Sequence, residues 1–343
     1  MRTPPSLILL IVVAAAAVTG AQSQEGFRFK SGVEFVNVTA TVTDGTGRFV
    51  SGLRQEDFTV YEDGQVQDVS HFSSDRVPVS LGIALDSSGS MTPEKVETAR
   101  AAIERLISKL LDEDDELFFM EFATRARLVQ GWTTDRRLIS DAMRRVEPVG
   151  GTALYDAVAE ALPTAAEGRN RKKALLVISD GNDTNSNISV SALRQRIRES
   201  EVLVYALGVD STKETRVVQQ PQVQFPPSIP FPFPGGGRRE PRFPPIGGGG
   251  GTTGTTSWPR SPGERVNAEA LRQITDDSGG RTEIVRGFDG LDGATARIAD
   301  ELSKQYFLGY TSSVNKDGRW HSIRVTVRDR NLNVRARKGY VAS

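Results

Sequence analysis

Short apolar runs alternate with segments of helical periodicity through the middle of this 343-residue chain. The apolar runs have strand length and are mostly continuous, as in parallel strands whose two faces are both covered; they are 77–85, 117–122, 175–178 and 202–208. The helical segments carry apolar residues three and four positions apart; they are 96–111, 135–146, 153–166, 190–197, 268–274 and 294–302. The alternation predicts an α/β fold with a doubly wound, mostly parallel sheet, to which 127–130 adds an antiparallel edge.

Both ends of the chain have strand patterns instead. Residues 32–43 alternate, with Val36, Val38, Ala40 and Val42 on one face, and 58–61 and 66–72 flank a hairpin turn at Glu62-Asp63-Gly64. At the other end 305–310, 322–327 and 333–336 are short strands. Neither set can bury an apolar face alone. We therefore predict that the ends pair into a small β-sandwich, which divides the chain into an N-terminal β segment (26–76), an inserted α/β domain (77–305) and a C-terminal β segment (306–343).

Residues 212–265 interrupt the α/β pattern. Phe-Pro repeats such as Phe231-Pro232-Phe233-Pro234 and the glycine run 247–251 cannot form a packed core, which predicts a disordered or polyproline insertion. The insertion follows the strand at 202–208, so we expect it at the carboxyl edge of the sheet. An inert low-complexity loop is the simpler interpretation, and a flap that shields this edge or recruits partners is the alternative.

The N-terminus has the pattern of a secretory leader. A basic start (Met1-Arg2), an apolar core from Leu7 to Val18 and small residues at Ala21 and Ser23 predict a signal peptide at 1–23. No later segment is apolar over the roughly 20 residues that a membrane span requires, so we expect an exported protein, periplasmic or extracellular, with no transmembrane segment after signal removal. The chain has no cysteine, which excludes disulfides and cysteine-ligated metals.

The net charge of the chain excludes few classes of function. Lys plus Arg and Asp plus Glu number 43 each, for a formal net charge of zero, and no basic block stands out. This balance gives no support to nucleic-acid binding.

Oxygen-bearing side chains follow the predicted strands at three places. Asp86, Ser88 and Ser90 come directly after the run 77–85, Thr152 follows Gly150-Gly151, and Asp180 follows the strand that ends near 178. Ligands bind outside the carboxyl ends of strands in open α/β sheets, and oxygen ligands suit a hard divalent cation. The sequence therefore predicts a metal site at this edge. Taken singly, each segment is also an ordinary polar loop, helix cap or turn.

Together these segments resemble the von Willebrand factor A (VWA) domain, whose metal-ion-dependent adhesion site (MIDAS) has the pattern D-x-S-x-S, then Thr, then Asp. The resemblance covers about 77–305 and implies a VWA, Rossmann-like fold. The whole chain also resembles exported bacterial VWA-related proteins of the acidobacterial type, through Phe58–Gly64 before the motif and Tyr306–Tyr310 after it.

The resemblance also implies a chemistry. It assigns Mg²⁺, or Mn²⁺ or Ca²⁺, to Asp86, Ser88, Ser90, Thr152 and Asp180. Ser88 and Ser90 would bind the ion directly, Asp86 and Asp180 through water, and Thr152 by either route. A protein partner presenting an Asp or Glu carboxylate would complete the coordination. In VWA domains that switch conformation the last helix shifts, and that helix is 291–304 here.

Enzymatic alternatives fit the residues less well. A magnesium-dependent phosphatase of the haloacid dehalogenase type would use Asp86 as nucleophile and Asp180 with Asp183 for the metal, but Ser88 stands where a carboxylate must act as general acid. Neither histidine, His71 or His321, lies beside a nucleophile signature. We therefore expect no catalytic residues and no enzyme, but an adhesion-type, metal-dependent protein-binding module. The phosphatase-like hydrolase, or a purely structural metal in an envelope assembly, remains the alternative.

Overall fold

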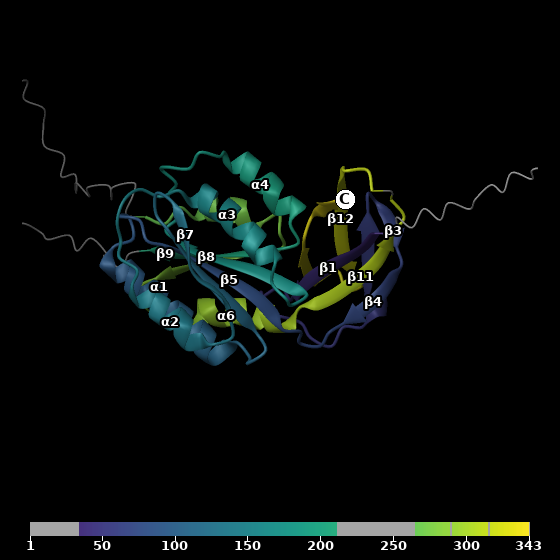
Figure 1. Ribbon diagram of the computed structural model, residues 1–343. Helices are drawn as coiled ribbons and strands as arrows, with labels where there is room; N and C mark the ends of the chain where they lie inside the picture. Colours follow the sequence, from purple (N-terminus) through teal and green to yellow (C-terminus); the bar gives the residue numbers. More distant parts are fainter. Residues whose placement is uncertain (1–33, 211–264, 289, 315, 343) are drawn as a thin grey trace, which may run out of the picture.

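Two units lie side by side in the computed structural model, which describes residues 34–210, 265–288, 290–314 and 316–342 (Figure 1). The larger unit is α/β, and the smaller is built from strands of both chain ends (Figure 1). The predicted leader at 1–23 and nearly all of the predicted insertion at 212–265 lie outside these residues. None of the described helices is long and apolar enough to cross a membrane.

A six-stranded sheet with the order β10-β9-β8-β5-β6-β7 forms the centre of the α/β unit. All neighbours are parallel except β6 and β7, so the predicted antiparallel edge is confirmed. The strands are β5 (Val79–Asp86), β6 (Glu116–Phe122), β7 (Ala126–Thr133), β8 (Lys172–Ser179), β9 (Leu203–Asp210) and β10 (Thr282–Arg286). The sequence did not predict β10, which has only five residues and two apolar ones.

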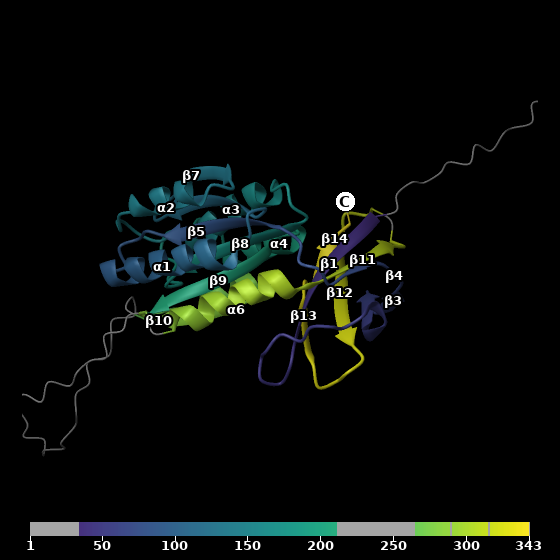
Figure 2. The ribbon, with the colours of Figure 1, turned by 90° about the horizontal axis from the view of Figure 1, so that it is seen from below.

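Helices cover both faces of this sheet. Its two hydrophobic cores lie on opposite faces, one under α1, α2 and α6 and the other under α3, α4 and α5, which confirms the doubly wound prediction. Figure 1 shows α3 and α4 on one side of the sheet and α1, α2 and α6 on the other, and Figure 2 looks from the side of α6. The helices are α1 (Pro93–Arg105), α2 (Arg136–Arg144), α3 (Leu154–Ala166), α4 (Val190–Glu199), α5 (Ala268–Thr275) and α6 (Leu291–Lys304). A π-helical turn, η2 (Leu106–Leu110), continues α1.

The predicted β-sandwich is confirmed. One sheet has the order β13-β1-β11-β4 and the other β14-β12-β2-β3, and their apolar faces share one core. Its elements are β1 (Glu34–Thr43), η1 (Gln55–Asp57), β2 (Phe58–Glu62), β3 (Gln65–Gln67), β4 (Val69–Ser73), β11 (Tyr306–Ser312), β12 (Trp320–Val327), β13 (Asn333–Ala336) and β14 (Gly339–Val341). In the first sheet β1 pairs with β11, and in the second β2 pairs with β12, so each sheet joins the two chain ends.

The strand predicted at 66–72 is wrong as a single element. The chain leaves the hairpin partner β3 at Gln67 and enters β4 at Val69, so the two halves belong to different sheets. The apolar residues of this stretch, Val66, Val69 and Phe72, come at every third position, and this spacing gives no signal of the crossing at Asp68. The short terminal strand β14 was not predicted either. The domain limits at 76/77 and 305/306 stay a proposal.

Polar side chains join the two units. Gln305 Nε2, between α6 and β11, donates to the Thr41 hydroxyl of β1 at 3.2 Å and to the Tyr205 hydroxyl of β9 at 2.9 Å. Tyr205 in turn donates to Glu301 Oε1 of α6 at 3.1 Å, and Arg335 of β13 forms an ion pair with Glu301. The last helix is therefore tied to both the central sheet and the sandwich.

Candidate metal site

Asp86 closes β5 and is fully buried. Its Oδ1 accepts a hydrogen bond from the Ser88 amide at 2.8 Å, and its Oδ2 accepts one from the Ser179 hydroxyl at 2.6 Å. Burial raises the pKa of Asp86 to about 6, and the nearby Asp180 charge adds to this, against the lowering effect of the hydrogen bonds from Ser179 and Ser88. A cation beside this carboxyl would favour its ionised form.

The loop after β5 brings two hydroxyls together. The Ser88 and Ser90 Oγ atoms lie 2.9 Å apart, and either can donate. The Gly89 amide donates to the Gly150 carbonyl at 2.9 Å, and a Cβ on Gly89 would lie 3.2 Å from that oxygen, tighter than ordinary contact. Glycine at 89 thus allows the loop of Ser88 and Ser90 to lie against the loop that carries Thr152.

Thr152 is only 2% exposed. Its amide donates to the Thr184 hydroxyl at 2.9 Å, and its carbonyl accepts from the amides of Thr184 and Asn185. Its own hydroxyl makes no hydrogen bond with any described residue. The Thr152 oxygen is therefore available to a ligand.

Asp180 follows β8 and is fully buried. Its Oδ1 accepts from the Asn182 amide at 3.2 Å, and its Oδ2 accepts from Lys95 Nζ at 2.8 Å. Lys95, in the first turn of α1, is 1% exposed and also donates to the Ser90 carbonyl at 3.0 Å. One lysine thus connects the first and last segments of the predicted motif.

Lys95 is the residue that the sequence reasoning missed. A signal was present, because Lys95 shares one face of α1 with the buried Ala99 and Ala102, at spacings of four and seven residues. A lysine on the apolar stripe of a helix requires a counter-charge, and the nearest motif carboxylate supplies it.

The remaining candidates have structural contacts of their own. Asp183, the second carboxylate of the phosphatase alternative, accepts from the Leu154 amide at 2.8 Å and so caps α3. His71 packs edge-on against Phe307, and His321 contacts Asp63 and Asp317, all within the sandwich.

The donor set fits a hard divalent cation. It comprises two buried carboxylates and three hydroxyls, which are the ligand types that Mg²⁺ and Mn²⁺ accept. In the residues that the structure describes, no group of three or more His, Cys, Asp or Glu side chains is placed to hold an ion. Hydroxyl oxygens would therefore be part of any ion site at this edge.

Comparison with known proteins identifies the α/β unit. Residues 81–182, which include every predicted metal residue, match the family model of the von Willebrand factor type A domain. This region therefore matches the VWA family, as the motif predicted. An uncharacterized protein from Synechocystis, sll0103, is 31% identical over 137 residues. That match covers 39% of this chain and 32% of the relative, so the chain spans about a third of the relative's length.

Several solved structures are also similar. The protein BatB from Bacteroides thetaiotaomicron is 21% identical, with a TM-score of 0.44, over 65% of this chain and 98% of that one. A von Willebrand factor type A protein from Catenulispora acidiphila is 14% identical, with a TM-score of 0.45, over 91% and 75%. Proximal thread matrix protein 1 from the mussel byssus, with a zinc-occupied MIDAS motif, is 14% identical, with a TM-score of 0.47, over 71% and 50%.

Proposed function

We propose that this chain is an exported, adhesion-type binding module, in which Asp86, Ser88, Ser90, Thr152 and Asp180 hold a divalent cation that accepts a carboxylate from a protein partner. Mg²⁺, with Mn²⁺ or Ca²⁺ as substitutes, is the proposed ion. The observation that carries the proposal is the Thr152 hydroxyl, which has no hydrogen bond with a described residue and belongs to a loop whose Val149 amide and Gly150 carbonyl bond to Ser87 and Gly89. VWA domains generally serve as interaction modules rather than enzymes.

The hydrogen bonds favour hydroxyls as the direct ligands. Both oxygens of Asp86 and both of Asp180 already accept from protein donors, whereas among the described residues the Ser90 hydroxyl bonds only to that of Ser88. Lys95 offsets one of the two carboxylate charges. The site would therefore neutralise only part of the charge of a bound cation, which would act as a Lewis acid toward an external carboxylate.

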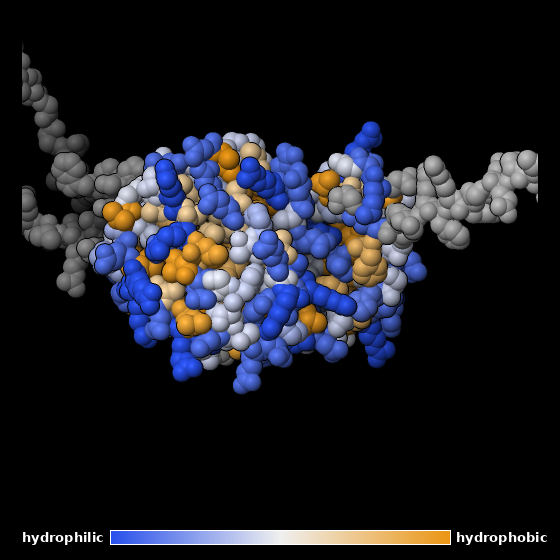
Figure 3. All heavy atoms as spheres, in the orientation of Figure 1, coloured by the Kyte–Doolittle hydropathy of each residue, from blue (hydrophilic) through white to orange (hydrophobic). Residues whose placement is uncertain are grey.

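Exposed apolar side chains at the same edge support a protein partner. Val149 is 70% exposed, and its amide donates to the Ser87 carbonyl within the site loop. Phe288 is 56% exposed just beyond β10, next to Gly287, whose amide donates to the carbonyl of Asp210 at the end of β9. On the face seen in Figure 3, hydrophobic atoms form small patches within a mostly polar surface. Apolar contacts around a charged centre are typical of protein interfaces.

Binding of a carboxylate to the Mn²⁺-loaded protein tests the proposal. Water-proton relaxation measures the water on bound Mn²⁺, and titration with a glutamate-containing peptide should lower it, because the side-chain carboxylate replaces a water. The matching glutamine peptide is the control. Thr152→Ala should remove the peptide effect and keep the fold, measured by circular dichroism. If Thr152→Ala only lowers thermal stability and the peptide has no effect on the wild type, the metal is structural.

A further inference from the structure

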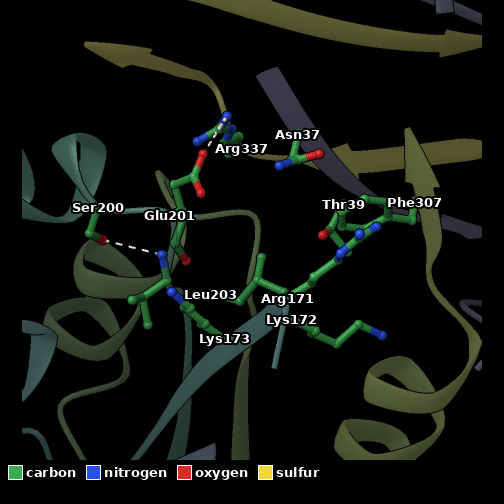
Figure 4. Close-up of a pocket in the computed structure, with 12 residues that line it drawn as sticks. Asn37, Thr39, Arg171, Lys172, Lys173, Ser200, Glu201, Leu203, Phe307 and Arg337 are labelled. Atoms are coloured by element: carbon green, nitrogen blue, oxygen red, sulfur yellow. Dashed lines mark hydrogen bonds and ion pairs between the residues drawn. The ribbon is translucent and has the colours of Figure 1, made fainter. Parts of the chain in front are cut away.

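A basic pocket lies between the two units, at the end of the sheet opposite the metal site (Figure 4). It is open to solvent and is bordered by the first residues of β8, the loop before β9, and strands of the sandwich. Four of its lining side chains are cationic, Arg171, Lys172, Lys173 and Arg337, and Glu201 is its only carboxylate among the described residues. The pocket therefore has an excess of positive charge.

Arg337 supplies the buried cation. It is 9% exposed and lies over the Tyr340 ring, 5.7 Å from the centroid. Its Nη2 lies 3.4 Å from Glu201 Oε1, but its buried Nε has no hydrogen-bond partner among the described residues. Leaving a charged donor unpaired away from water is costly. An acceptor bound in the pocket would therefore stabilise this guanidinium.

Arg171 and two side chains of β1 add further unused donors. Arg171 makes no hydrogen bond or ion pair with the described part of the chain, and the same holds for the side chains of Asn37 and Thr39. Figure 4 shows Arg171 and Arg337 on opposite sides of the pocket, with Asn37 between them. Donors thus approach the same space from several directions.

The two lysines contribute charge rather than contacts. Lys172 Nζ donates to the Leu302 carbonyl of α6 at 2.7 Å, and Lys173 Nζ donates to the Ala166 carbonyl. Burial, together with the charge of Arg76, lowers the pKa of Lys172 to about 8, despite Asp115 and Glu301. Burial likewise lowers the pKa of Arg337, despite Glu201. An anion in the pocket would offset both effects.

We propose that this pocket binds an oxyanion of the phosphate or sulfate type, either free or as a group on a larger molecule. Guanidinium forks from opposite sides, with an amide and a hydroxyl between them, match an anion whose oxygens point in several directions better than a planar carboxylate. Because the sandwich and the α/β unit both contribute donors, the bound anion also connects the two units. The proposal is independent of the metal site.

Calorimetric titration with inorganic phosphate at low ionic strength tests this assignment, because salt screens such contacts. We expect saturable binding that Arg171→Gln weakens at least tenfold and Glu201→Gln strengthens several-fold, since that change removes the opposing charge. Arg171 is exposed, so its loss leaves the fold intact, which circular dichroism confirms. Arg144→Gln, which removes one exposed positive charge on α2, is the matched control and should bind as the wild type does.

Glycerol 3-phosphate separates the two sources of the anion. Tighter binding than phosphate indicates a phosphate group on a larger molecule, and equal or weaker binding indicates the free ion. The assignment is overturned if neither probe nor sulfate binds, or if Arg171→Gln and Arg144→Gln have the same effect.

Discussion

At the residue scale, Lys95 explains how two carboxylates share a buried site. Asp86 and Asp180 are both fully buried, and without Lys95 their charges would repel each other with little solvent screening. The Lys95–Asp180 ion pair, at 2.8 Å, also holds the Asp180 carboxylate in place. The D-x-S-x-S pattern predicted which residues carry oxygens, but nothing in it indicates the cation that balances them.

Replacing Lys95 with methionine tests this account. Loss of one partner of a buried ion pair should lower the free energy of unfolding by about 3–5 kcal/mol in the absence of metal. Added Mg²⁺ should raise the melting temperature more in this variant than in the wild type, because the site is one charge more negative. Lys304→Met, which removes a half-exposed lysine paired with Asp300, controls for the lost charge. A smaller Mg²⁺ response in Lys95→Met than in the wild type contradicts the account.

His321 provides a pH-dependent contact within the sandwich. Its Nδ1 lies 2.7 Å from Asp63 Oδ2 and its Nε2 lies 3.2 Å from Asp317 Oδ1. Burial lowers the pKa of His321, but the two aspartates outweigh it and raise the pKa above 6.5. Burial raises the pKa of Asp63, but contacts with His321 and Ser322 outweigh it and bring the pKa below 3.8. Hydrogen bonds from Arg319 and His321 likewise lower the pKa of Asp317 below 3.8.

The stabilisation from this contact should be confined to a pH window. The raised pKa of His321 gives stability that is complete below about pH 6.5 and is lost as the pH rises through the folded value. The lowered aspartate pKa values give stability that is lost as the pH falls below about 3.8. We expect His321→Gln to lower the free energy of unfolding by at most about 1 kcal/mol near pH 5, and by less at pH 8. A double-mutant cycle with Asp63→Asn measures the coupling free energy between His321 and Asp63. A coupling that is larger at pH 8 than at pH 5 would contradict a stabilising contact of charged His321.

At the scale of elements, the period of the apolar residues determined what could be predicted. Long segments with a clear period, such as those of β5 and α3, lie where the pattern placed them. Two predictions failed at this scale. The strand β10 was missed because it is too short to show a period, and the single strand predicted at 66–72 is divided between β3 and β4. For the site, the motif predicted which loops meet, but the bonds that hold them there, such as Gly89 to Gly150, depend on loop conformation.

Asp277 joins helices of the α/β unit to the end of the sandwich. This buried carboxylate accepts from Arg194 and Arg198 of α4, at 2.9 and 3.0 Å, and from Lys338 before β14, at 3.2 Å. Burial raises its pKa, but the three cations outweigh this and lower it. The charge of Asp277 is therefore needed where α4 meets the sandwich.

Asp277→Ala should weaken this junction. We expect a loss of about 2–3 kcal/mol in the free energy of unfolding by urea, less than for a fully buried pair because the three cations are partly exposed. Asp276→Ala, at the neighbouring position, is the matched control and should have a small effect. Equal effects of the two substitutions would show that the junction does not depend on this carboxylate.

At the scale of the whole molecule, the two proposed sites lie at opposite ends of the central sheet. The cation edge is formed where β5 and β8 end, and the basic pocket where β8 and β9 begin. α6 runs along the sheet between them and continues directly into the sandwich strand β11, while Lys172 of the pocket binds its Leu302 carbonyl. A shift of this helix would therefore change both the pocket and the sandwich.

Titration calorimetry of the protein with Mg²⁺ and Mn²⁺, alongside Asp86→Ala and Ser88→Ala, tests the central claim most directly. The account predicts saturable binding of one ion per chain in the wild type and its loss in both variants, with the fold kept by circular dichroism. Absence of binding in the wild type, or binding that persists unchanged in both variants, would contradict a metal-dependent binding function at this edge.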